Sequence, residues 1–344
     1  MPAAKKRTSP AAADQLVLGV DVGGTKVAAG LVDARGQIVW RTRRPMVARK
    51  SAEEGTAAVI DAIKSVLASD AARGTKIAAV GISAPGNIDP IGGKIVRAAN
   101  LPCWRDYPLA DAVRRAVKLP VFLDNDGNAA ALAEAAWGAG VGYDVVFYCT
   151  LGTGVGTGLV MHGHVFHGRT GAAGEGGHVS IDYRGPRCAC GKLGCIEVFA
   201  AGPAIAQRAR ARLTQAERLR ESPRSKILEY AGSIKAVTAE HVGKASLEGD
   251  APATEVLQET ADYLAIWLGN VIDLLEPDVI VVGGGLGHLM ATFFGYIRAQ
   301  LPKWSINPRC QEIPIVSAMY GAVSGIAGAA ALCLPAARLA AAAR

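Results

Sequence analysis

The segment Gly171–Glu197 constrains the fold of this chain more than any other stretch, because three cysteines stand in it at C-x-C-x₄-C spacing. They are Cys188, Cys190 and Cys195, and His178 lies just upstream. Three thiolates and one imidazole suit a closed tetrahedral Zn²⁺ site, and the glycines among them let a short loop fold back on one metal. The alternative is a loop of free or disulfide-bonded cysteines, which an odd cysteine total without a secretion signal disfavours.

Two carboxylates, Glu175 and Glu197, flank this cluster and are suited to hydrogen-bonding hydroxyl groups. The patterns G-E-x-G-H and C-x-C-G-x-x-G-C-x-E together resemble the signature of the ROK family, which includes bacterial glucokinases and related sugar kinases. The resemblance covers roughly residues 16–334. It implies an α/β fold of the actin/hexokinase-like (ribonuclease H-like) type, with two lobes, ATP in the cleft between them and a structural zinc.

The amino-acid composition limits which classes of protein this chain can belong to. Half of the 344 residues are hydrophobic, enough for two domains of ordinary size. There is no run of 18 apolar residues that would predict a membrane span. Seven cysteines without a signal peptide favour a reducing cytoplasm. Four cysteines outside the cluster are scattered and are expected to be small core residues: Cys103, Cys149, Cys310 and Cys333.

The net charge of +7 is modest, and more than half of the excess lies on the two ends of the chain. No basic stripe interleaved with aromatic residues is apparent, so nucleic-acid binding is not favoured. We therefore expect small-molecule partners, a sugar and ATP, and neither nucleic acid nor a membrane. The resemblance further implies a homodimer or homotetramer.

Strands and helices alternate along the chain, which predicts an α/β architecture. A helix is expected to start at Ser51, because Ser51 and Glu54 have the spacing of a capping box. Other predicted helices are Leu109–Val117, Ala129–Trp137, Ala204–Arg220, Thr254–Leu275 and Phe293–Leu301. Predicted strands are Leu16–Asp21, Val27–Val32, Ile38–Arg41, Ile77–Ile82, Val121–Leu123, Val145–Thr150, Leu159–Met161, Val279–Val282 and Ile313–Val316.

The predicted domains follow from this order. Residues 1–14 form a disordered tail, 15–126 an N-terminal α/β lobe, 127–317 a C-terminal lobe with the zinc loop, and 335–344 a flexible tail. The C-terminal helix, Ala318–Leu334, is expected to pack back on the N-terminal lobe, as the resemblance implies.

Two glycine turns, one in each half, join pairs of strands. The first, Asp21–Thr25, offers backbone N–H groups and a hydroxyl to phosphate oxygens, and Asp21 could hold Mg²⁺ through water. The second is Gly152–Gly158. A plain glycine hairpin is the alternative for such a turn. A nicotinamide cofactor is not favoured, because Thr157 replaces the third glycine of a dinucleotide fingerprint and an extended segment follows.

A third glycine segment, Gly283–Gly285, follows a strand and opens a helix, which suits adenosine binding or plain packing. The resemblance makes the three segments a phosphate loop, a second Gly-Thr-Gly loop and an adenosine-side pair. The residues that it implies for ATP are Asp21, Gly23, Gly24, Thr25, Lys26, Gly152, Thr153, Gly154, Gly283 and Gly284.

Asn125 and Asp126 stand at a strand end before a helix, where functional groups of α/β sheets meet ligands. On the residues alone, a turn-forming cluster is the favoured interpretation. The resemblance instead implies that Asp126 is the catalytic base and that Asn125 binds sugar hydroxyls.

The same resemblance implies sugar contacts from Glu175, Glu197 and His178, and of these His178 would also ligate zinc. It implies further that Gly86 and Asn100 line the sugar pocket. A surface loop is the alternative for the last two. Three other histidines, His162, His164 and His167, also cluster, and a second metal site is the alternative for them. No carboxylate or cysteine accompanies them, so we predict a solvated strand face.

These patterns predict an ATP-dependent hexose kinase, most like a glucokinase, with Mg²⁺ and a structural Zn²⁺. An N-acetylmannosamine or N-acetylglucosamine kinase is the rival within the same class, and polyphosphate stays open as a donor. A sugar-responsive repressor is the alternative from another class. About fourteen residues precede the first strand, too few for the helix-turn-helix that such a repressor carries.

Overall fold

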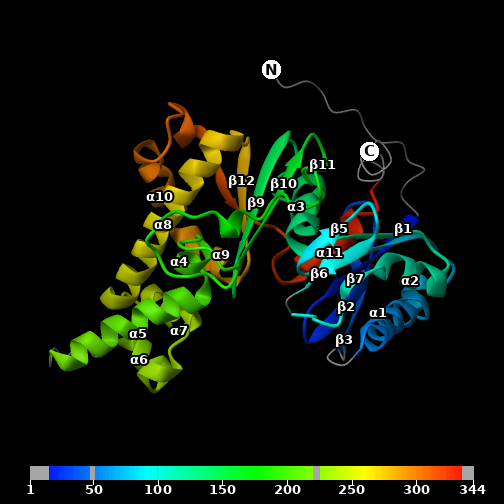
Figure 1. The fold of residues 1–344 in the computed structure, drawn as a ribbon, viewed down its shortest axis with the longest axis horizontal. Coiled ribbons are helices and arrows are strands. Elements are labelled where there is room, and N and C mark those ends of the chain that lie inside the picture. Colours follow the sequence, from blue (N-terminus) through cyan, green and yellow to red (C-terminus); the bar gives the residue numbers. More distant parts are fainter. Residues whose placement is uncertain (1–14, 47–50, 99, 220–224, 335–344) are drawn as a thin grey trace. The chain divides into compact units, whose positions relative to one another are not determined.

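The computed structural model describes residues 15–46, 51–98, 100–219 and 225–334, so both predicted tails lie outside the described residues. Its internal contacts divide the chain into two compact units (Figure 1). Unit 1 takes in the chain up to Val141, the segment Gly163–Ala173 and the residues from Val323 onwards. Unit 2 comprises Gly142–His162 and Gly174–Ala322. The chain thus passes between the units at different residues from those predicted above.

Unit 1 is built on a five-stranded sheet in the order β3-β2-β1-β4-β8. Its first three strands form an antiparallel meander, and the last two run parallel to β1. The strands are β1 (Gln15–Val22), β2 (Lys26–Val32), β3 (Ile38–Pro45), β4 (Lys76–Ala84) and β8 (Val121–Asn125). A second sheet of three short strands contains β5 (Asn87–Asp89), β6 (Lys94–Arg97) and β7 (Arg105–Tyr107).

One face of the unit 1 sheet packs on α1 (Ala52–Leu67) and α2 (Leu109–Val117), with Leu18, Val59 and Ile63 in a shared core. The predicted start of α1 is confirmed, since the Ser51 hydroxyl accepts a hydrogen bond from the Glu54 backbone N–H at 3.1 Å. Because successive side chains of a strand point to opposite faces of the sheet, every second side chain of β1 points towards these helices.

The other face packs on α11 (Ser324–Ala331), which also lies against α3 (Asp126–Trp137). Glycines permit this close approach, because a Cβ atom on Gly19 or Gly81 would collide with the backbone of α11. The helix is shorter than the predicted Ala318–Leu334. A 3₁₀ turn precedes it at Gly321–Val323, and the positive φ of Gly321 (48°) is incompatible with a continuous α-helix.

Unit 2 contains the neighbouring strands β10-β9-β12-β13, in which β9 and β10 are antiparallel and β12 runs parallel to β9 and β13. Their bounds are β9 (Val145–Leu151), β10 (Val155–Met161), β12 (Val279–Gly283) and β13 (Ile315–Ser317). The second glycine turn is therefore shorter than predicted, because β10 begins at Val155. The two-residue strand β11 (His164–Val165) follows β10 in the chain.

Helices supply the rest of the unit 2 core, with the long α8 (Ala251–Leu275) burying Val256, Leu264 and Trp267. The other helices are α4 (Glu197–Ala200), α5 (Gly202–Arg218), α6 (Lys226–Ala231), α7 (Ala239–Leu247), α9 (Gly285–Met290) and α10 (Phe294–Gln300). The described part of the chain also contains short 3₁₀ segments, of which Gly176–His178 (η3) matters for the site.

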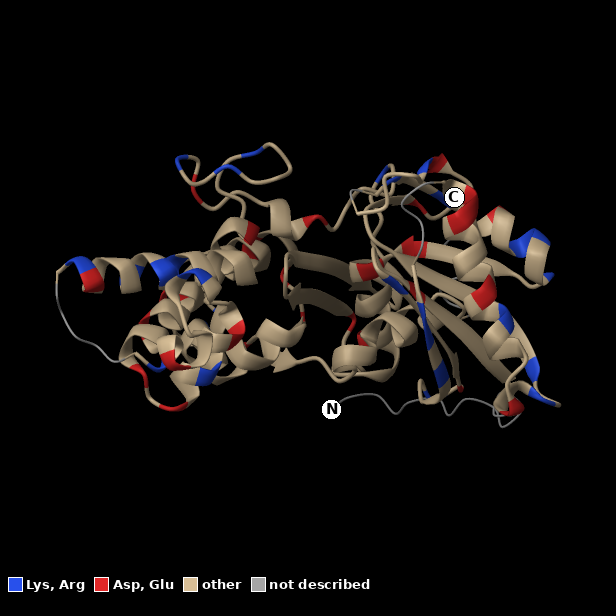
Figure 2. Cartoon of the chain, turned by 90° about the horizontal axis from the view of Figure 1, so that it is seen from below, with Lys and Arg blue, Asp and Glu red and all other residues tan. Residues whose placement is uncertain are grey.

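Lys and Arg are interspersed among Asp and Glu along the helices of each unit (Figure 2). Among the described residues, no helix is long and apolar enough to cross a membrane. Three of the four scattered cysteines, Cys149, Cys310 and Cys333, are buried as predicted, whereas Cys103 is half-buried.

Candidate active site and metal centre

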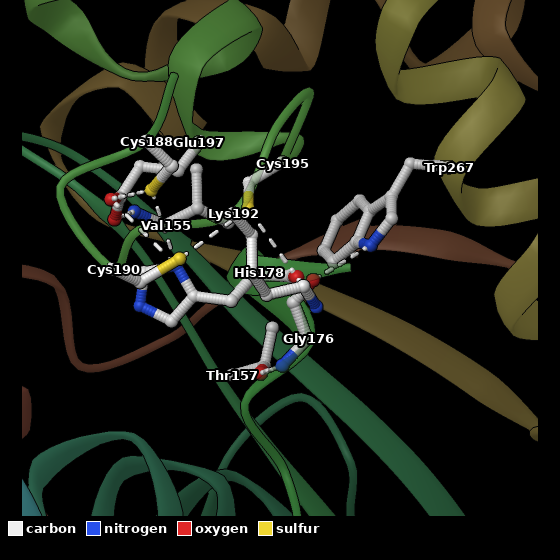
Figure 3. Close-up of polar contacts among 10 residues, drawn as sticks. All are labelled: Val155, Thr157, Gly176, His178, Cys188, Cys190, Lys192, Cys195, Glu197 and Trp267. Carbon is white, nitrogen blue, oxygen red and sulfur yellow. Dashed lines mark hydrogen bonds and ion pairs between the residues drawn. The ribbon is translucent and has the colours of Figure 1, made fainter. Parts of the chain in front are cut away.

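The four residues predicted as metal ligands come together in unit 2 (Figure 3). The ligand atoms of His178, Cys188, Cys190 and Cys195 all lie within 4.8 Å of one another. The Cys190 and Cys195 sulfurs are 3.7 Å apart, and Nδ1 of His178 is 3.6 Å from the Cys188 sulfur. Metal–ligand distances of about 2.0–2.3 Å in a tetrahedron place ligands roughly 3.6–3.8 Å apart. Two of the six pairs of ligand atoms therefore have the spacing of a tetrahedral metal site, and the whole cluster, within 4.8 Å, is slightly wider.

The loop that carries the cysteines owes its compactness to glycines and backbone pairing. Isolated β-bridges join Ser180 to Cys195 and Arg187 to Leu193. Gly194 has a φ of 64°, and a Cβ atom there would collide with the backbone carbonyl of Asp182. Only glycine meets both requirements without strain. Lys192 adds a hydrogen bond from Nζ to the backbone oxygen of His178 at 2.7 Å.

The pKa values of the three thiols are shifted in different directions. Burial, with smaller effects of the neighbouring thiols, raises the pKa of Cys195 to about 12. Burial also raises the pKa of Cys188, whereas the backbone N–H of Lys192 lowers that of Cys190. Neighbouring thiolates repel one another, so a cation within the cluster is what would allow all three to ionise.

Glu197, the first residue of α4, faces this cluster. Its Oε1 lies 4.0 Å from Nδ1 of His178 and 3.7 Å from the Cys188 sulfur, while Oε2 accepts the backbone N–H of Val155 at 3.1 Å. A Cβ atom on Gly154 would stand only 2.6 Å from Oε2. The glycine turn between β9 and β10 and the metal loop are therefore packed against each other through this carboxylate.

Glu175 immediately precedes η3, which ends at His178. The turn is held on both sides: the backbone N–H of Gly176 donates to Oγ1 of Thr157 at 2.7 Å, and its carbonyl accepts from Nε1 of Trp267 at 3.1 Å. Sequence reasoning missed both anchors. In the sequence, Trp267 is one apolar residue among many in α8 and gives no further signal. Thr157 gives one signal, because it stands where a dinucleotide fingerprint has its third glycine.

Gly283 and Gly284, which were predicted to lie on the adenosine side, stand beside the second glycine turn. Gly283 pairs with Thr150 across the parallel strands β12 and β9. Gly284 has a φ of 82°, and a Cβ atom there would collide with the carbonyl of Leu151. Within unit 2 the structure thus brings together Gly152–Gly154 and Gly283–Gly284, as well as the metal cluster with Glu197.

In unit 1, Asn125 and Asp126 mark the junction of β8 and α3. Asn125 is the N-cap of α3: its Oδ1 accepts the Gly127 N–H at 2.8 Å, and its Nδ2 donates to the Gly86 carbonyl at 2.9 Å. Asp126 opens the helix with an exposed side chain, where the helix dipole favours a carboxylate. The structure therefore joins three of the predicted site residues, Gly86, Asn125 and Asp126.

The first glycine turn is closed by a hydrogen bond from the Gly23 N–H to the Lys26 carbonyl at 2.9 Å. A side chain at Gly24 would contact Asn100, which places Asn100 beside this turn. Burial raises the pKa of Asp21, while the Ser83 hydroxyl, which donates to its Oδ1 at 3.3 Å, and the charges of Lys26 and Arg43 act in the opposite direction.

The prediction of a solvated face for the three histidines is wrong for His167. Its Nε2 lies 2.6 Å from Oδ2 of Asp124, whose side chain is only 4% exposed. His162 is exposed in a turn with φ of 51°. Nδ1 of His164 is buried without a hydrogen-bond partner among the described residues. The carboxylate that accompanies His167 comes from a distant part of the sequence.

Two α/β units, each carrying a glycine turn between antiparallel strands, define the class of this protein as an actin/hexokinase-like α/β fold. The chain belongs to the ROK family, since the model of the "ROK family" matches residues 17–336. The predicted family and fold class are thereby confirmed.

Known proteins resemble the chain over most of its length. The glucokinase of Thermotoga maritima is 33% identical over 316 residues, which cover 92% of this chain and 96% of that protein. The N-acetyl-D-glucosamine kinase of Salmonella heidelberg is 30% identical and is covered to 98%. A solved ROK family glucokinase from Streptomyces griseus, in complex with glucose and AMPPNP, superimposes with a TM-score of 0.76 at 34% identity, covering 92% of this chain and 98% of the other.

Proposed function

We propose that this protein is an ATP-dependent sugar kinase that phosphorylates glucose to glucose 6-phosphate. The single observation that carries the proposal is the likeness, over 92% of the chain, to a glucokinase described in complex with glucose and an ATP analogue. Curated glucokinases of similar identity add support. The β8–α3 junction and the two glycine turns also support the proposal, because they offer a carboxylate and backbone N–H groups of the kind that such chemistry uses.

Asp126 is the proposed general base. Its carboxylate is exposed at the first residue of α3, so it is accessible to a substrate hydroxyl. Phosphoryl transfer depends mainly on positioning and on stabilisation of charge, and the base accepts the proton of the attacking hydroxyl. Asn125, fixed by Gly86 and Gly127, offers an amide that both donates to and accepts from sugar hydroxyls. Asn100, Glu175, His178 and Glu197 are the further proposed sugar contacts.

The backbone N–H groups of the turns at Gly23–Thr25 and Gly152–Gly154 are the proposed phosphate ligands. Lys26 would add a positive charge, and Gly283–Gly284 would admit the adenosine. Asp21 would hold Mg²⁺ through water, and its partial burial beside Ser83 fits an outer ligand of this kind. When bound, Mg²⁺ neutralises charge that develops on the transferred phosphoryl group.

We further propose that the metal is a structural Zn²⁺, because the donor set is three sulfurs and one imidazole nitrogen within 4.8 Å of one another. Nδ1 of His178 faces the sulfurs, which leaves Nε2 for a sugar hydroxyl. Cys190→Ser should remove the metal and lower the melting temperature, because the free energy of metal binding contributes to the free energy of folding.

Elemental analysis of the purified protein tests the proposed zinc site, and we expect one zinc per chain for the wild type. Cys103→Ser, at a half-buried cysteine of unit 1, is the matched control and should retain the metal. Well-folded wild-type protein that contains no zinc would contradict the assignment.

Glucose should be the best acceptor in a panel of hexoses and N-acetylhexosamines assayed with ATP. The likeness to an N-acetyl-D-glucosamine kinase makes that sugar and N-acetylmannosamine the necessary comparisons. The steady-state kcat/KM for each sugar decides which acceptor is preferred. Replacing ATP by polyphosphate tests which phosphoryl donor the protein uses. A higher kcat/KM for either N-acetylhexosamine would move the protein to the rival class.

A further inference from the structure

We propose that His167, acting through Asp124, is a positioning residue for Asn125 and Asp126. The inference deepens the proposed kinase function, because Asp126 is its general base. It rests on one buried hydrogen-bond network within unit 1, which connects the segment Gly163–Ala173 to the junction of β8 and α3.

Asp124 is the centre of this network. Its Oδ1 accepts two hydrogen bonds, from the backbone N–H of Asn125 at 2.7 Å and from Nδ2 of Asn128 at 3.1 Å. Its Oδ2 lies 2.6 Å from Nε2 of His167. An ionised carboxylate can only accept, so the proton of this bond belongs to Nε2. Both carboxylate oxygens therefore have donors, as a buried charge requires.

The two donors to Oδ1 lie on either side of Asp126. Asn125 is the last residue of β8, and Asn128 belongs to the first turn of α3, with only 3% of its surface exposed. Asp124 thus fixes the angle between β8 and α3 at the junction where Asp126 begins the helix. The N-cap bond of Asn125 reaches only the backbone of Gly127, the second residue of the helix, whereas Asp124 also holds the side chain of Asn128.

His167 is the external support of Asp124. The pair lines a cavity of about 290 Å³, together with the turn at Asp89–Ile91, Leu132 of α3 and Leu332. Without the imidazole, Oδ2 would face this cavity without its donor, and Asp124 could rotate towards water that enters. Rotation would release Asn125 and Asn128 together, because both depend on Oδ1. A displacement of about 1 Å at a catalytic group can reduce the rate by about 10²-fold.

A purely stabilising pair would behave differently from a positioning pair. Loss of stability lowers the fraction of folded protein but leaves kcat per folded molecule unchanged. Loss of positioning lowers kcat in fully folded protein, leaves KM for ATP near its wild-type value, and is restored by any side chain that can donate to Oδ2. The glutamine in His167→Gln has such a donor, whereas the alanine in His167→Ala does not.

The experiment compares His167→Ala, His167→Gln, Asp124→Asn and the double variant His167→Ala with Asp124→Asn in the full chain. We expect His167→Ala to lower kcat about 10–100-fold, with KM for ATP within about twofold, and His167→Gln to recover most of the loss. The double variant should be no worse than the poorer single variant, because coupled residues are not additive. His162→Ala, at an exposed histidine of the same stretch of chain, is the control and should match the wild type.

Hydrogen exchange of the peptide that spans residues 121–128 gives a readout independent of activity. His167→Ala should speed exchange of its amides and His167→Gln should not. If the wild type phosphorylated no sugar but this pattern held, the proposed function would fail and the network would stand. Unchanged exchange together with unchanged kcat in folded His167→Ala, or additive effects in the double variant, would overturn the proposal.

Discussion

Replacing Asp126 by asparagine should lower kcat by about 10²–10⁴-fold, the usual contribution of a general base. The amide keeps the size and polarity of the side chain but cannot take the proton of the attacking hydroxyl. Binding of the sugar should change little, because an amide still hydrogen-bonds a hydroxyl. We expect its dissociation constant to stay within about tenfold of the wild-type value, or about 1.4 kcal/mol.

Two further variants sharpen this test, which combines steady-state kinetics with calorimetry. Asn125→Ala removes the N-cap of α3 and the bond to Gly86, so sugar binding should weaken and stability should fall by about 1 kcal/mol. Asp61→Asn alters an exposed aspartate of α1 in the same unit and should leave kcat unchanged. If Asp126→Asn retained more than about a tenth of the wild-type kcat, the assigned base would be wrong.

The metal cluster and the β8–α3 junction could be predicted from the sequence because their residues are close together in the chain. Cys188, Cys190 and Cys195 share one loop, and thiols that stand so close together in a chain are typical of a zinc site. The strands of the larger sheets were predicted for a related reason, since buried runs such as Val279–Val282 are short, apolar and bounded by turn residues, whereas the short strands β5, β6, β7 and β11 were not predicted.

Contacts between distant segments could not be predicted in this way. His167 and Asp124 are 43 residues apart, and nothing in the pattern around either residue indicates the other. Trp267 meets the metal segment across 91 residues, while its periodicity in α8 indicates only a core position. Such pairs depend on tertiary packing, which a local pattern does not record.

The start of α11 also could not be predicted from the sequence. The predicted helix Ala318–Leu334 consists mainly of small residues that a helix accommodates well, and no strong breaker other than glycine interrupts it. In the structure the backbone N–H of Ala318 donates to the Val282 carbonyl, so this residue continues beyond β13 as part of unit 2. The helix can begin only after Gly321, where the chain has passed to unit 1.

Gly81→Ala should destabilise unit 1 by about 3 kcal/mol, the upper end of the usual cost of overpacking a core. Gly81 lies in the middle of β4, and a Cβ atom there would collide with the carbonyl oxygen of Ala329 and approach its carbon to 2.7 Å. Both atoms belong to the backbone of α11, so no side-chain rotation can relieve the collision, and the helix itself must move away from the sheet.

The movement of α11 should also affect the proposed phosphate-binding turn at Asp21–Thr25, because α11 begins beside Asp21. A Cβ atom on Gly325 would meet Oδ1 of that carboxylate at 2.6 Å, and Ser83 donates to the Gly325 carbonyl at 3.3 Å. Movement of α11 should therefore raise KM for ATP as well as lower the midpoint of urea unfolding. Gly295→Ala is the matched control: this glycine of α10 has open space around it, and alanine should raise helix stability by about 0.5–1 kcal/mol. Equal unfolding midpoints for Gly81→Ala and the wild type would show that α11 does not pack on β4 as closely as described.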